Sequence, residues 1–286
     1  MNNAIEKANV LIEALPYIRK FAGSTVVVKY GGSAMIDDAM RLSVIQDIVL
    51  MKRIGFNPVV VHGGGNAITD MLGRLGMKSS FIDGMRVTDK ETAEIAEMIL
   101  SGNIGKSLVQ SFQTQGIQAV SISGKDGDTL VAKKKLSGGN DIGFVGDITK
   151  VNTELLLSLM KNDFIPVVAP IGTDSKGNTY NINADFAASA IAGALQAQKL
   201  VFLTDVEGIM KDKDDPSSIM RQLTLAQAQS YINDGTISGG MIPKATCCMD
   251  GIKKGVESVH ILDGRMPHSL LLEIFTNDGI GTMMTK

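Results

Sequence analysis

VVVKYGGSA (residues 26–34) joins a run of β-branched residues to two glycines, and PVVVHGGGN (residues 58–66) repeats this combination. Each run is typical of a buried strand, and an amphipathic stretch follows each set of glycines. Glycines between a strand and a helix let the backbone approach a ligand, and the N-terminus of the helix behind them favours an anion. The two stretches therefore predict a parallel sheet with strand ends that suit phosphate or carboxylate.

Strands and helices alternate through the rest of the chain. From hydrophobic periodicity we expect helices over residues 36–54, 66–76, 90–101, 104–115, 153–161, 184–196, 223–232 and 239–255. We expect strands over residues 118–123, 164–169, 200–203 and 258–262, a β-rich patch at 81–88, and short strands within 130–151 that turn at Gly138-Gly139. This alternation predicts an α/β fold, a three-layer αβα sandwich with a mostly parallel central sheet and ligands at the carboxyl ends of its strands.

The chain is expected to divide into two lobes and a leading helix. The polar segment TDSKGN (residues 173–178) marks the predicted boundary between an N-terminal lobe, residues 23–175, and a C-terminal lobe, residues 176–286. Residues 1–22 precede the first strand, and Pro16 should kink or divide the helix that they form. The apolar residues that share one face of this helix are Ile5, Ala8, Leu11, Ile12, Leu15, Ile18 and Ala22. That face either packs on its own lobe or contacts another subunit.

Composition excludes several classes of protein. The 286 residues carry a net charge of −2, which provides no basic field for a nucleic acid. No apolar run is long enough to span a membrane, and charged residues interrupt the N-terminal segment, so a signal peptide is not expected. The two cysteines, Cys247 and Cys248, are neighbours and the chain has three histidines, so no metal-ligand spacing exists. We expect reduced core thiols in a cytoplasmic protein.

Two familiar nucleotide-binding motifs are incomplete. The run of glycines at 63–65 resembles the start of a dinucleotide-binding motif, but Ile68 occupies the position of its third glycine. Gly105-Lys106-Ser107 resembles the end of a P-loop, but Leu100 stands where the earlier glycine is required, and the predicted context is between two helices. We therefore expect neither an NAD site nor a P-loop, and we interpret Lys106 as a solvated helix residue.

Polar residues at the ends of predicted elements form the candidate site. Lys29 follows a buried strand, where an ammonium group needs an anionic partner. Arg86 lies on a predicted hairpin and suits a bidentate contact with a carboxylate. Further polar groups begin or end elements at residues 181–185, 203–209 and 238–244. Each has a plain structural alternative, such as a helix cap or a solvated charge, but together they predict chemistry on anions.

These residues lie in motifs that can be compared with known families. The motifs are KYGGSA from Lys29, VHGGGN from Val61, DGMRVTD from Asp83, NINAD from Asn181, LTDVEGI from Leu203 and SGGMIPK from Ser238. In this order they resemble the amino acid kinase family over essentially the whole chain. The glycine pairs and LTDVEGI are similar to the wider family, which includes aspartate, glutamate, carbamate and UMP kinases. DGMRVTD and NINAD resemble the members that act on N-acetyl-L-glutamate, and Asn66 is a mild departure from their pattern.

The resemblance implies ATP-dependent phosphorylation of the side-chain carboxylate of N-acetyl-L-glutamate, a step in arginine biosynthesis. The roles it implies are catalysis for Lys29, Lys244 and Asp185, binding of acetylglutamate for Gly64, Gly65, Arg86 and Asn181, and binding of ATP for Gly31, Gly32, Thr204, Asp205 and Lys211. A carboxylate nucleophile with a pKa of about 4.3 is ionised at neutral pH, so no general base is required. The protein has to bring two anions together and spread the charge of the transition state. No carboxylate cluster for Mg²⁺ is evident in the sequence, so we expect the nucleotide phosphates and water to hold it.

The two ends of the chain resemble those of arginine-inhibited members of the family. Such members associate through the N-terminal helix into hexamers, built as trimers of dimers. The resemblance implies inhibition by L-arginine bound beside that helix, surrounded by Tyr17, Lys211, His268 and Glu273. Two other hypotheses stay open: another member of the family, such as a carbamate or UMP kinase, and a non-catalytic amino acid or nucleotide sensor. Retention of both lysines argues against a sensor, which has no use for transition-state charge.

Overall fold

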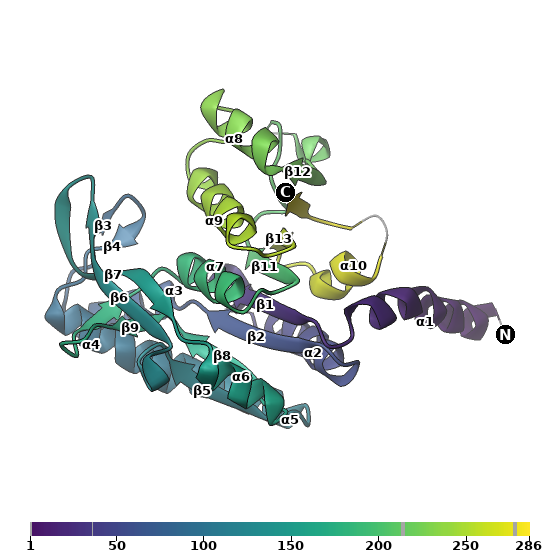
Figure 1. Cartoon of the computed structure of the whole chain (residues 1–286), viewed down its shortest axis with the longest axis horizontal. Coiled ribbons are helices and arrows are strands. Elements are labelled where there is room, and N and C mark those ends of the chain that lie inside the picture. The colour runs from purple at the N-terminus through teal and green to yellow at the C-terminus, as the bar shows by residue number, and fades with distance from the viewer. Residues whose placement is uncertain (1, 36, 213–214, 277–278) are drawn as a thin grey trace.

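A computed structural model describes residues 2–35, 37–212, 215–276 and 279–286, and an eight-stranded sheet forms the centre of this part of the chain (Figure 1). In spatial order the strands are β12 (Gln222–Thr224), β14 (Thr282–Thr285), β13 (Ser258–Asp263), β11 (Lys199–Thr204), β1 (Thr25–Tyr30), β2 (Asn57–His62), β8 (Ile165–Ala169) and β5 (Ala119–Ser123). Neighbouring strands run parallel except β13 and β14, which are antiparallel. The predicted α/β fold with a mostly parallel sheet is confirmed.

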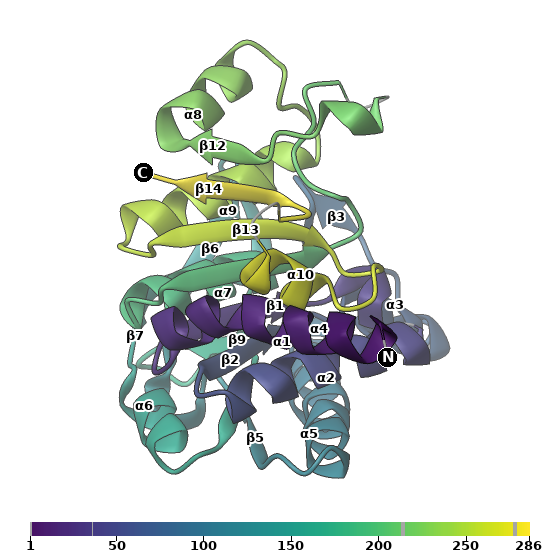
Figure 2. The ribbon, with the colours of Figure 1, turned by 90° about the vertical axis from the view of Figure 1, so that its right-hand side faces the viewer.

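Helices cover both faces of this sheet (Figure 2). One face packs against α6 (Glu154–Lys161), α7 (Ala184–Ala194), α8 (Leu225–Asn233) and α9 (Met241–Lys253). The other face packs against α2 (Asp38–Arg53), α3 (Gly65–Arg74), α5 (Gly105–Thr114) and α10 (Ser269–Phe275). Successive side chains of a strand point to opposite faces, so Val27 and Val28 belong to different hydrophobic clusters. The β-branched runs are apolar on both faces because both faces are covered.

Four strands outside the main sheet form a second small sheet that closes on itself. They are β6 (Leu130–Ser137), β7 (Asn140–Val151), β9 (Ile171–Thr173) and β10 (Thr179–Asn181). Gly138 and Gly139 form the turn between β6 and β7, as expected, but the two strands are long rather than short. The segment 173–178 joins the paired strands β9 and β10 within this sheet. The division of the chain into two lobes stays a prediction.

The remaining elements surround the N-terminal half of the sheet. A short hairpin consists of β3 (Phe81–Ile82) and β4 (Met85–Arg86). Helix α4 (Lys90–Glu97) continues into α5 through a π-helical segment, η2 (Met98–Ile104), so the break expected between two separate helices is absent there. A π-helical turn widens a helix without ending it. Short 3₁₀ turns are η1 (Gly32–Met35), η3 (Asp126–Asp128) and η4 (Pro216–Ser218).

The N-terminal helix α1 (Asn2–Phe21) projects from the body of the molecule beside α10 (Figures 1 and 2). It continues through Pro16, which therefore does not divide it. Its C-terminal end is anchored by Phe21, whose ring centroid lies 6.1 Å from that of Phe56. Ile12 and Leu15 are exposed by 67% and 37%. The side chains of Ile5, Ala8 and Leu11 lie outside the described part of the structure, as does all of Ile36.

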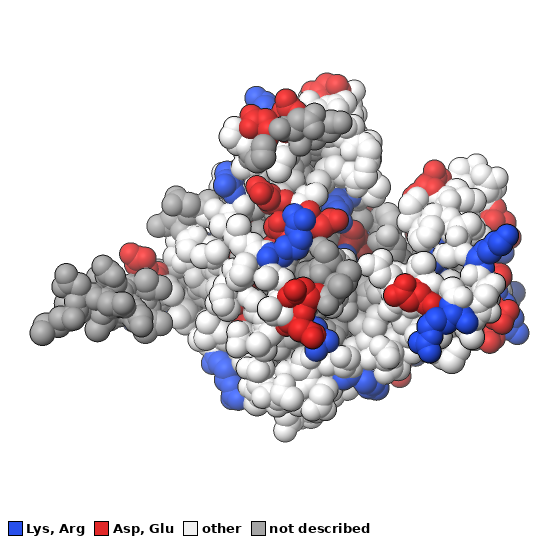
Figure 3. All heavy atoms as spheres, turned by 180° about the vertical axis from the view of Figure 1, so that it is seen from behind, with Lys and Arg blue, Asp and Glu red and all other residues white. Residues whose placement is uncertain are grey.

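Surface and core agree with an ordinary globular composition. Lysine, arginine, aspartate and glutamate are interspersed over the face shown in Figure 3, which fits the net charge of −2. Across the described residues, no helix has the length and apolar character needed to cross a membrane. Cys247 and Cys248 are buried in α9 and neither forms a disulfide, as expected for core thiols.

Candidate active site

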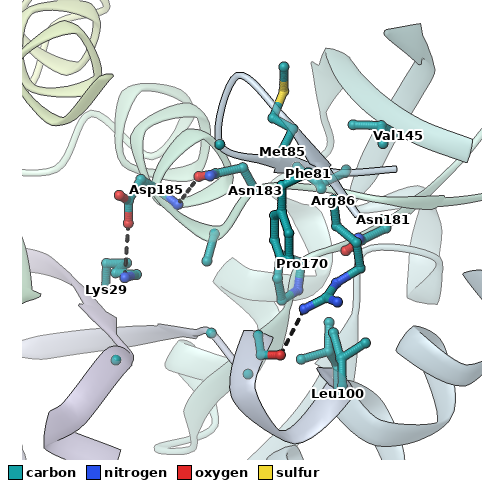
Figure 4. A pocket seen from close by; sticks show the side chains of 18 residues that line it. Lys29, Phe81, Met85, Arg86, Leu100, Val145, Pro170, Asn181, Asn183 and Asp185 are labelled. Carbon is teal, nitrogen blue, oxygen red and sulfur yellow. Dashed lines mark hydrogen bonds and ion pairs between the residues drawn. The ribbon is translucent and has the colours of Figure 1, made fainter. Parts of the chain in front are cut away.

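Two lysines from distant parts of the chain meet at one carboxylate. Lys29, near the end of β1, places Nζ 3.0 Å from Oδ1 of Asp185 (Figure 4). Lys244, in the first turns of α9, places Nζ 3.6 Å from Oδ2 of the same carboxylate. Asp185 is held at the start of α7 by the N-cap residue Asn183, whose Oδ1 accepts a hydrogen bond from the backbone N–H of Asp185 at 2.8 Å. The fold thus brings together the three residues assigned to catalysis from the sequence.

Asp185 is a mostly buried anion between two cations. Burial alone would raise the pKa of its carboxyl, but the charges of Lys29 and Lys244 outweigh burial and hold that pKa below its usual value of 3.8. The position in the first turn of α7 also favours a negative charge. Because one carboxylate stands between two ammonium groups, the cluster keeps a net positive charge that an anionic ligand can neutralise.

The glycines of the two loops are required for different reasons. Gly32 has φ +71°, a left-handed conformation that favours glycine. Gly64 is required for space, because a Cβ atom there would lie 2.4 Å from Cδ1 of Ile104 and 2.6 Å from Cδ2 of Leu100. Both of those side chains come from η2, so the π-helical segment packs directly against the second glycine loop. As a result, backbone without side chains forms part of a cavity wall beside Lys29.

Arg86 is a buried cation with neutral partners. Its Nη2 donates to the carbonyl of Gly65 at 2.8 Å and to Oγ1 of Thr69 at 2.9 Å, and Nη1 donates to Oγ of Ser79. Its Cζ lies 4.7 Å from the ring centroid of Phe81. Burial lowers the pKa of the guanidinium. A buried positive charge surrounded by neutral groups is a binding site for an anion.

A cavity of about 240 Å³ lies between the lysine–aspartate cluster and Arg86 (Figure 4). Asn181, at the end of β10, lines it and donates from Nδ2 to Oγ1 of Thr88 at 3.3 Å. The other polar walls are Lys29, Arg86, Asn183, Asp185 and the glycines 32, 63, 64 and 65, and the apolar walls include Ile68, Phe81, Leu100, Val145 and Pro170. The cavity therefore combines cationic ends with an apolar middle. Gly31, assigned to ATP from the sequence, adjoins it, because a Cβ atom there would lie 3.2 Å from Nζ of Lys29.

A second cavity of about 330 Å³ lies at the carboxyl end of β11. Asp205 lines it together with Glu207, Ser238, Met241 and Arg265. Thr204 is buried just before it, and its hydroxyl donates to Oδ1 of Asp205 at 3.1 Å. Lys211, the third residue assigned to nucleotide from the C-terminal half, is exposed and is not among the described residues that line this cavity.

A third cavity, of about 420 Å³, separates α1 from α10 and the edge of the sheet. Two of the residues assigned to arginine, Tyr17 and Glu273, line it. The other two lie elsewhere in the described structure: Lys211 is in an exposed loop, and Nδ1 of His268 lies 2.6 Å from Oδ1 of Asp47 on α2.

Sequence reasoning missed the two buried basic residues that line this third cavity, Lys199 and His260. Nζ of Lys199 lies 3.1 Å from Nε2 of His260, and Nδ1 of His260 lies 2.7 Å from Oε1 of Glu273. Burial lowers the pKa of Lys199 to about 8. Lys199 is the first residue of β11 and His260 lies within β13, and a basic residue in a largely apolar buried strand is the signal that could have identified them. The partners of Arg86 were missed as well, because nothing in the sequence relates Thr69 and Ser79 to it.

Comparison with known proteins agrees with this geometry. The model of the amino acid kinase family matches residues 24–263. The chain is 53% identical over 295 residues to the acetylglutamate kinase of Heliobacterium modesticaldum, and the match covers all of both chains. It is 54% identical over 282 residues to the acetylglutamate kinase of a Thermoanaerobacter species, covering 99% of this chain and 94% of that one.

Solved structures share the fold. N-acetylglutamate synthase from Neisseria gonorrhoeae, in complex with coenzyme A and N-acetyl-glutamate, matches with a TM-score of 0.85 and 27% identity. The match covers 98% of this chain and 63% of that protein. Carbamate kinase from Giardia lamblia, bound to AMP-PNP, matches with a TM-score of 0.67 and 16% identity, over 93% of this chain and 99% of that one, and shows the fold alone. The chain therefore belongs to the amino acid kinase family, and within it to the acetylglutamate kinases.

Proposed function

We propose that the chain transfers the γ-phosphoryl group of ATP to the side-chain carboxylate of N-acetyl-L-glutamate, in the arginine biosynthetic route of the cytoplasm. The observation that carries this proposal is the cluster of Lys29, Asp185 and Lys244 at one end of a cavity whose other end is the buried Arg86. The names of relatives at 53% and 54% identity support the choice of acceptor. N-acetyl-glutamate bound to the synthase of the same fold supports it further.

The reaction needs charge stabilisation rather than a base. An oxygen of the acceptor carboxylate, already ionised, forms a bond to the γ-phosphorus while the bond to the bridging oxygen of ADP breaks, giving an acyl phosphate and ADP. Negative charge on the transferred group is offset by the ammonium groups of Lys29 and Lys244. Asp185 keeps those two ammonium groups at a fixed separation, because it contacts both. The backbone N–H groups of the glycine loops supply further donors.

The same cavity selects the acetylated amino acid. Guanidinium has five N–H donors, and the three hydrogen bonds of Arg86 leave one donor on Nε and one on Nη1, either of which can bind the α-carboxylate of the acceptor. Among the residues described as lining the cavity, Asp185 alone is acidic, and both of its oxygens already face lysines. The ammonium group of free glutamate would have no partner there, whereas an acetamide is neutral and its methyl group suits the apolar walls. Asn181 lines the same cavity, which supports a hydrogen bond from its amide to the same ligand.

ATP is proposed to enter as Mg-ATP, with its base and ribose in the second cavity beside Asp205 and its phosphates directed toward Gly31, Gly32 and Lys244. The N-terminal turns of α9 connect the two cavities, since Met241 lines one and Lys244 contacts Asp185 in the other. In the described part of the chain, no group of three or more acidic, histidine or cysteine side chains is arranged to hold a metal ion. The magnesium ion is therefore treated as part of the nucleotide substrate.

One assay tests the reaction. Mg-ATP and N-acetyl-L-glutamate should yield ADP and an acyl phosphate that hydroxylamine traps as a hydroxamate, with unacetylated glutamate a far poorer acceptor. Carbamate and UMP serve as the acceptors of the competing hypotheses. Faster turnover of glutamate, carbamate or UMP would overturn the proposal.

We also propose that L-arginine inhibits the enzyme from the third cavity. An arginine ligand carries a guanidinium for the carboxylate of Glu273 and a carboxylate for the ammonium of Lys199, and both side chains line the cavity with Tyr17. Support also comes from N-acetylglutamate synthase of Neisseria gonorrhoeae, solved with coenzyme A and L-arginine, which matches with a TM-score of 0.82 and 26% identity over 98% of this chain and 65% of that one. The projecting helix α1, with Ile12 and Leu15 exposed, supports association of subunits into a hexamer, a trimer of dimers.

A further inference from the structure

His62 is a fully buried histidine that adjoins the active-site glycines without lining the cavity. It is the last residue of β2 and is 0% exposed. The three residues that follow it, glycines 63, 64 and 65, all line the cavity that contains Lys29 and Asp185. Its Nδ1 lies 3.0 Å from the carbonyl oxygen of Gly63.

The partner of Nδ1 fixes the tautomer of the ring. A carbonyl oxygen can only accept, so Nδ1 must carry the hydrogen and donate it to Gly63. Nε2 is then an acceptor, and it is buried without a hydrogen-bond partner among the described residues. Burial lowers the pKa of His62 to about 4, so the ring is neutral throughout the physiological range. The neutral imidazole therefore has one N–H donor, and that donor binds the carbonyl of Gly63.

That donor fixes the direction of the neighbouring N–H. In a trans peptide the C=O of one residue and the N–H of the next point in opposite directions. Because the Gly63 carbonyl points at the buried ring, the Gly64 N–H points away from the ring. The adjacent groups are also held: Gly63 N–H donates to Tyr30 O at 2.8 Å, and Gly64 O accepts from Ile68 N–H at 3.0 Å.

Glycine on both sides makes this peptide easy to turn over, because neither residue has a Cβ atom to restrict rotation. Resting on the proposed phosphoryl transfer, we propose that His62 is a positioning residue, which locks the Gly63–Gly64 peptide so that the Gly64 N–H faces the transferring phosphoryl group. The N–H then adds a fixed donor to the charge of Lys29 and Lys244. A donor that is already oriented costs no reorganisation when charge develops in the transition state.

Two substitutions separate this role from simple packing. His62→Asn keeps an N–H donor close to the position of Nδ1 but is smaller and polar, whereas His62→Leu fills the apolar site without a donor. A positioning role predicts that Leu lowers kcat by about tenfold to a hundredfold, with each KM within about threefold, and that Asn restores most of kcat. A packing role predicts the opposite order, because Leu suits a buried apolar site better than Asn. Thermal unfolding of both variants verifies that they fold.

A second measurement does not depend on the acceptor. ADP with aluminium fluoride imitates the transferring phosphoryl group, and its affinity should fall at least about tenfold in His62→Leu, while the affinity for ADP alone stays unchanged. The positioning role would be overturned if kcat of His62→Leu equalled or exceeded that of His62→Asn. It would also be overturned if His62→Leu bound ADP with aluminium fluoride as tightly as the wild type. Failure of the wild-type chain to form a hydroxamate with acetylglutamate would instead overturn the proposed acceptor, and the fluoride comparison would still test His62.

Discussion

Lys29 and Asp185 form an ion pair of 3.0 Å between the end of β1 and the first turn of α7. The pair connects a strand near the N-terminus to a helix in the C-terminal half, next to the sheet position where β1 pairs with β11. The ammonium group of Lys29 is consequently held in one position at the carboxyl ends of the strands. Its charge is available to a ligand because Asp185 shares its own charge with Lys244.

Removal of either lysine should reduce the rate of the chemical step. We expect Lys29→Ala and Lys244→Ala to lower kcat by about 10²–10³, as loss of an oriented donor does in other enzymes. Steady-state kinetics with Mg-ATP and acetylglutamate measure this effect. Lys106→Ala is the control, because Lys106 is exposed and contacts only the Ser121 carbonyl among the hydrogen bonds described for it. Unchanged kcat in both test variants would contradict the proposed mechanism.

Arg86 should act mainly on binding of the acceptor. We expect Arg86→Ala to raise KM for acetylglutamate by more than about tenfold while KM for ATP changes little, because its contact exists in both the ground state and the transition state. Arg74→Ala, in the exposed last turn of α3, is the matched control. An equal rise in both KM values would show that Arg86 supports the fold rather than the acceptor.

His62 should make stability depend on pH. The pKa of the folded group is about 4 against 6.5 when unperturbed, so between these values the unfolded chain binds a proton that the folded chain does not. The free energy of unfolding should therefore fall by about 3 kcal/mol as pH decreases from 6.5 to 4, at about 1.4 kcal/mol per pH unit. Urea unfolding at pH 7, 5.5 and 4 gives the free energy of unfolding of the wild type and of His62→Asn. The difference between the two proteins at each pH removes the contribution of the other titrating groups. Parallel curves for the two proteins would contradict the depressed pKa.

Glu273 should determine sensitivity to arginine. We expect Glu273→Gln to weaken inhibition by L-arginine at least about tenfold, because the charge opposite the ligand's guanidinium is lost. Dose–response curves with L-arginine measure the effect, and His268→Asn is the comparison, since His268 pairs with Asp47 outside the third cavity. Greater loss of sensitivity in His268→Asn than in Glu273→Gln would contradict the third cavity as the arginine site and would favour a site at His268.

The N-terminal helix should join dimers. Light scattering should give a hexamer for the intact chain, and deletion of residues 1–22 should give dimers and abolish sensitivity to arginine. Ile12→Glu tests the apolar face without removing the helix, because Ile12 is 67% exposed and its replacement disturbs no core. Dimers for the intact chain, or a hexamer for the truncated one, would rule out this assembly.

The sequence predicted the longer buried strands better than the short strands at one edge of the sheet. β1, β2, β8, β11 and β13 are apolar runs covered on both faces, so their pattern is unmistakable. β12 and β14 were not predicted because they are short strands at or near one edge of the sheet, where pairing decides their conformation: β14 pairs with β13, and β12 pairs with β14. The continuity of α4 and α5 was missed, because glycine disfavours a helix interior, whereas the π-helical segment η2 contains Gly102 and α5 begins at Gly105.

The sequence likewise predicted some residues of the candidate sites and missed others. Motif order alone indicated Lys29, Asp185 and Lys244, and the fold brings them into contact. The ring of Phe81 lies beside Arg86 because the two residues pair across the β3–β4 hairpin, which is a local contact. The contact between Lys199 and His260 could not be predicted, because they are neighbours only through the pairing of β11 with β13, two strands far apart in sequence. Local spacing cannot express such contacts.

The residues of the candidate site come from several different elements. Lys29, Lys244 and Asp185 stand on the sheet and on helices packed against it, whereas Arg86 comes from the β3–β4 hairpin and Asn181 from the small second sheet. The β3–β4 hairpin belongs to neither of the larger sheets, whereas the second sheet shares a hydrophobic core with the main sheet and β10 leads directly into α7, which carries Asp185. Changes to the hairpin are therefore expected to alter recognition of the acceptor with less effect on the lysine–aspartate cluster than changes to the second sheet.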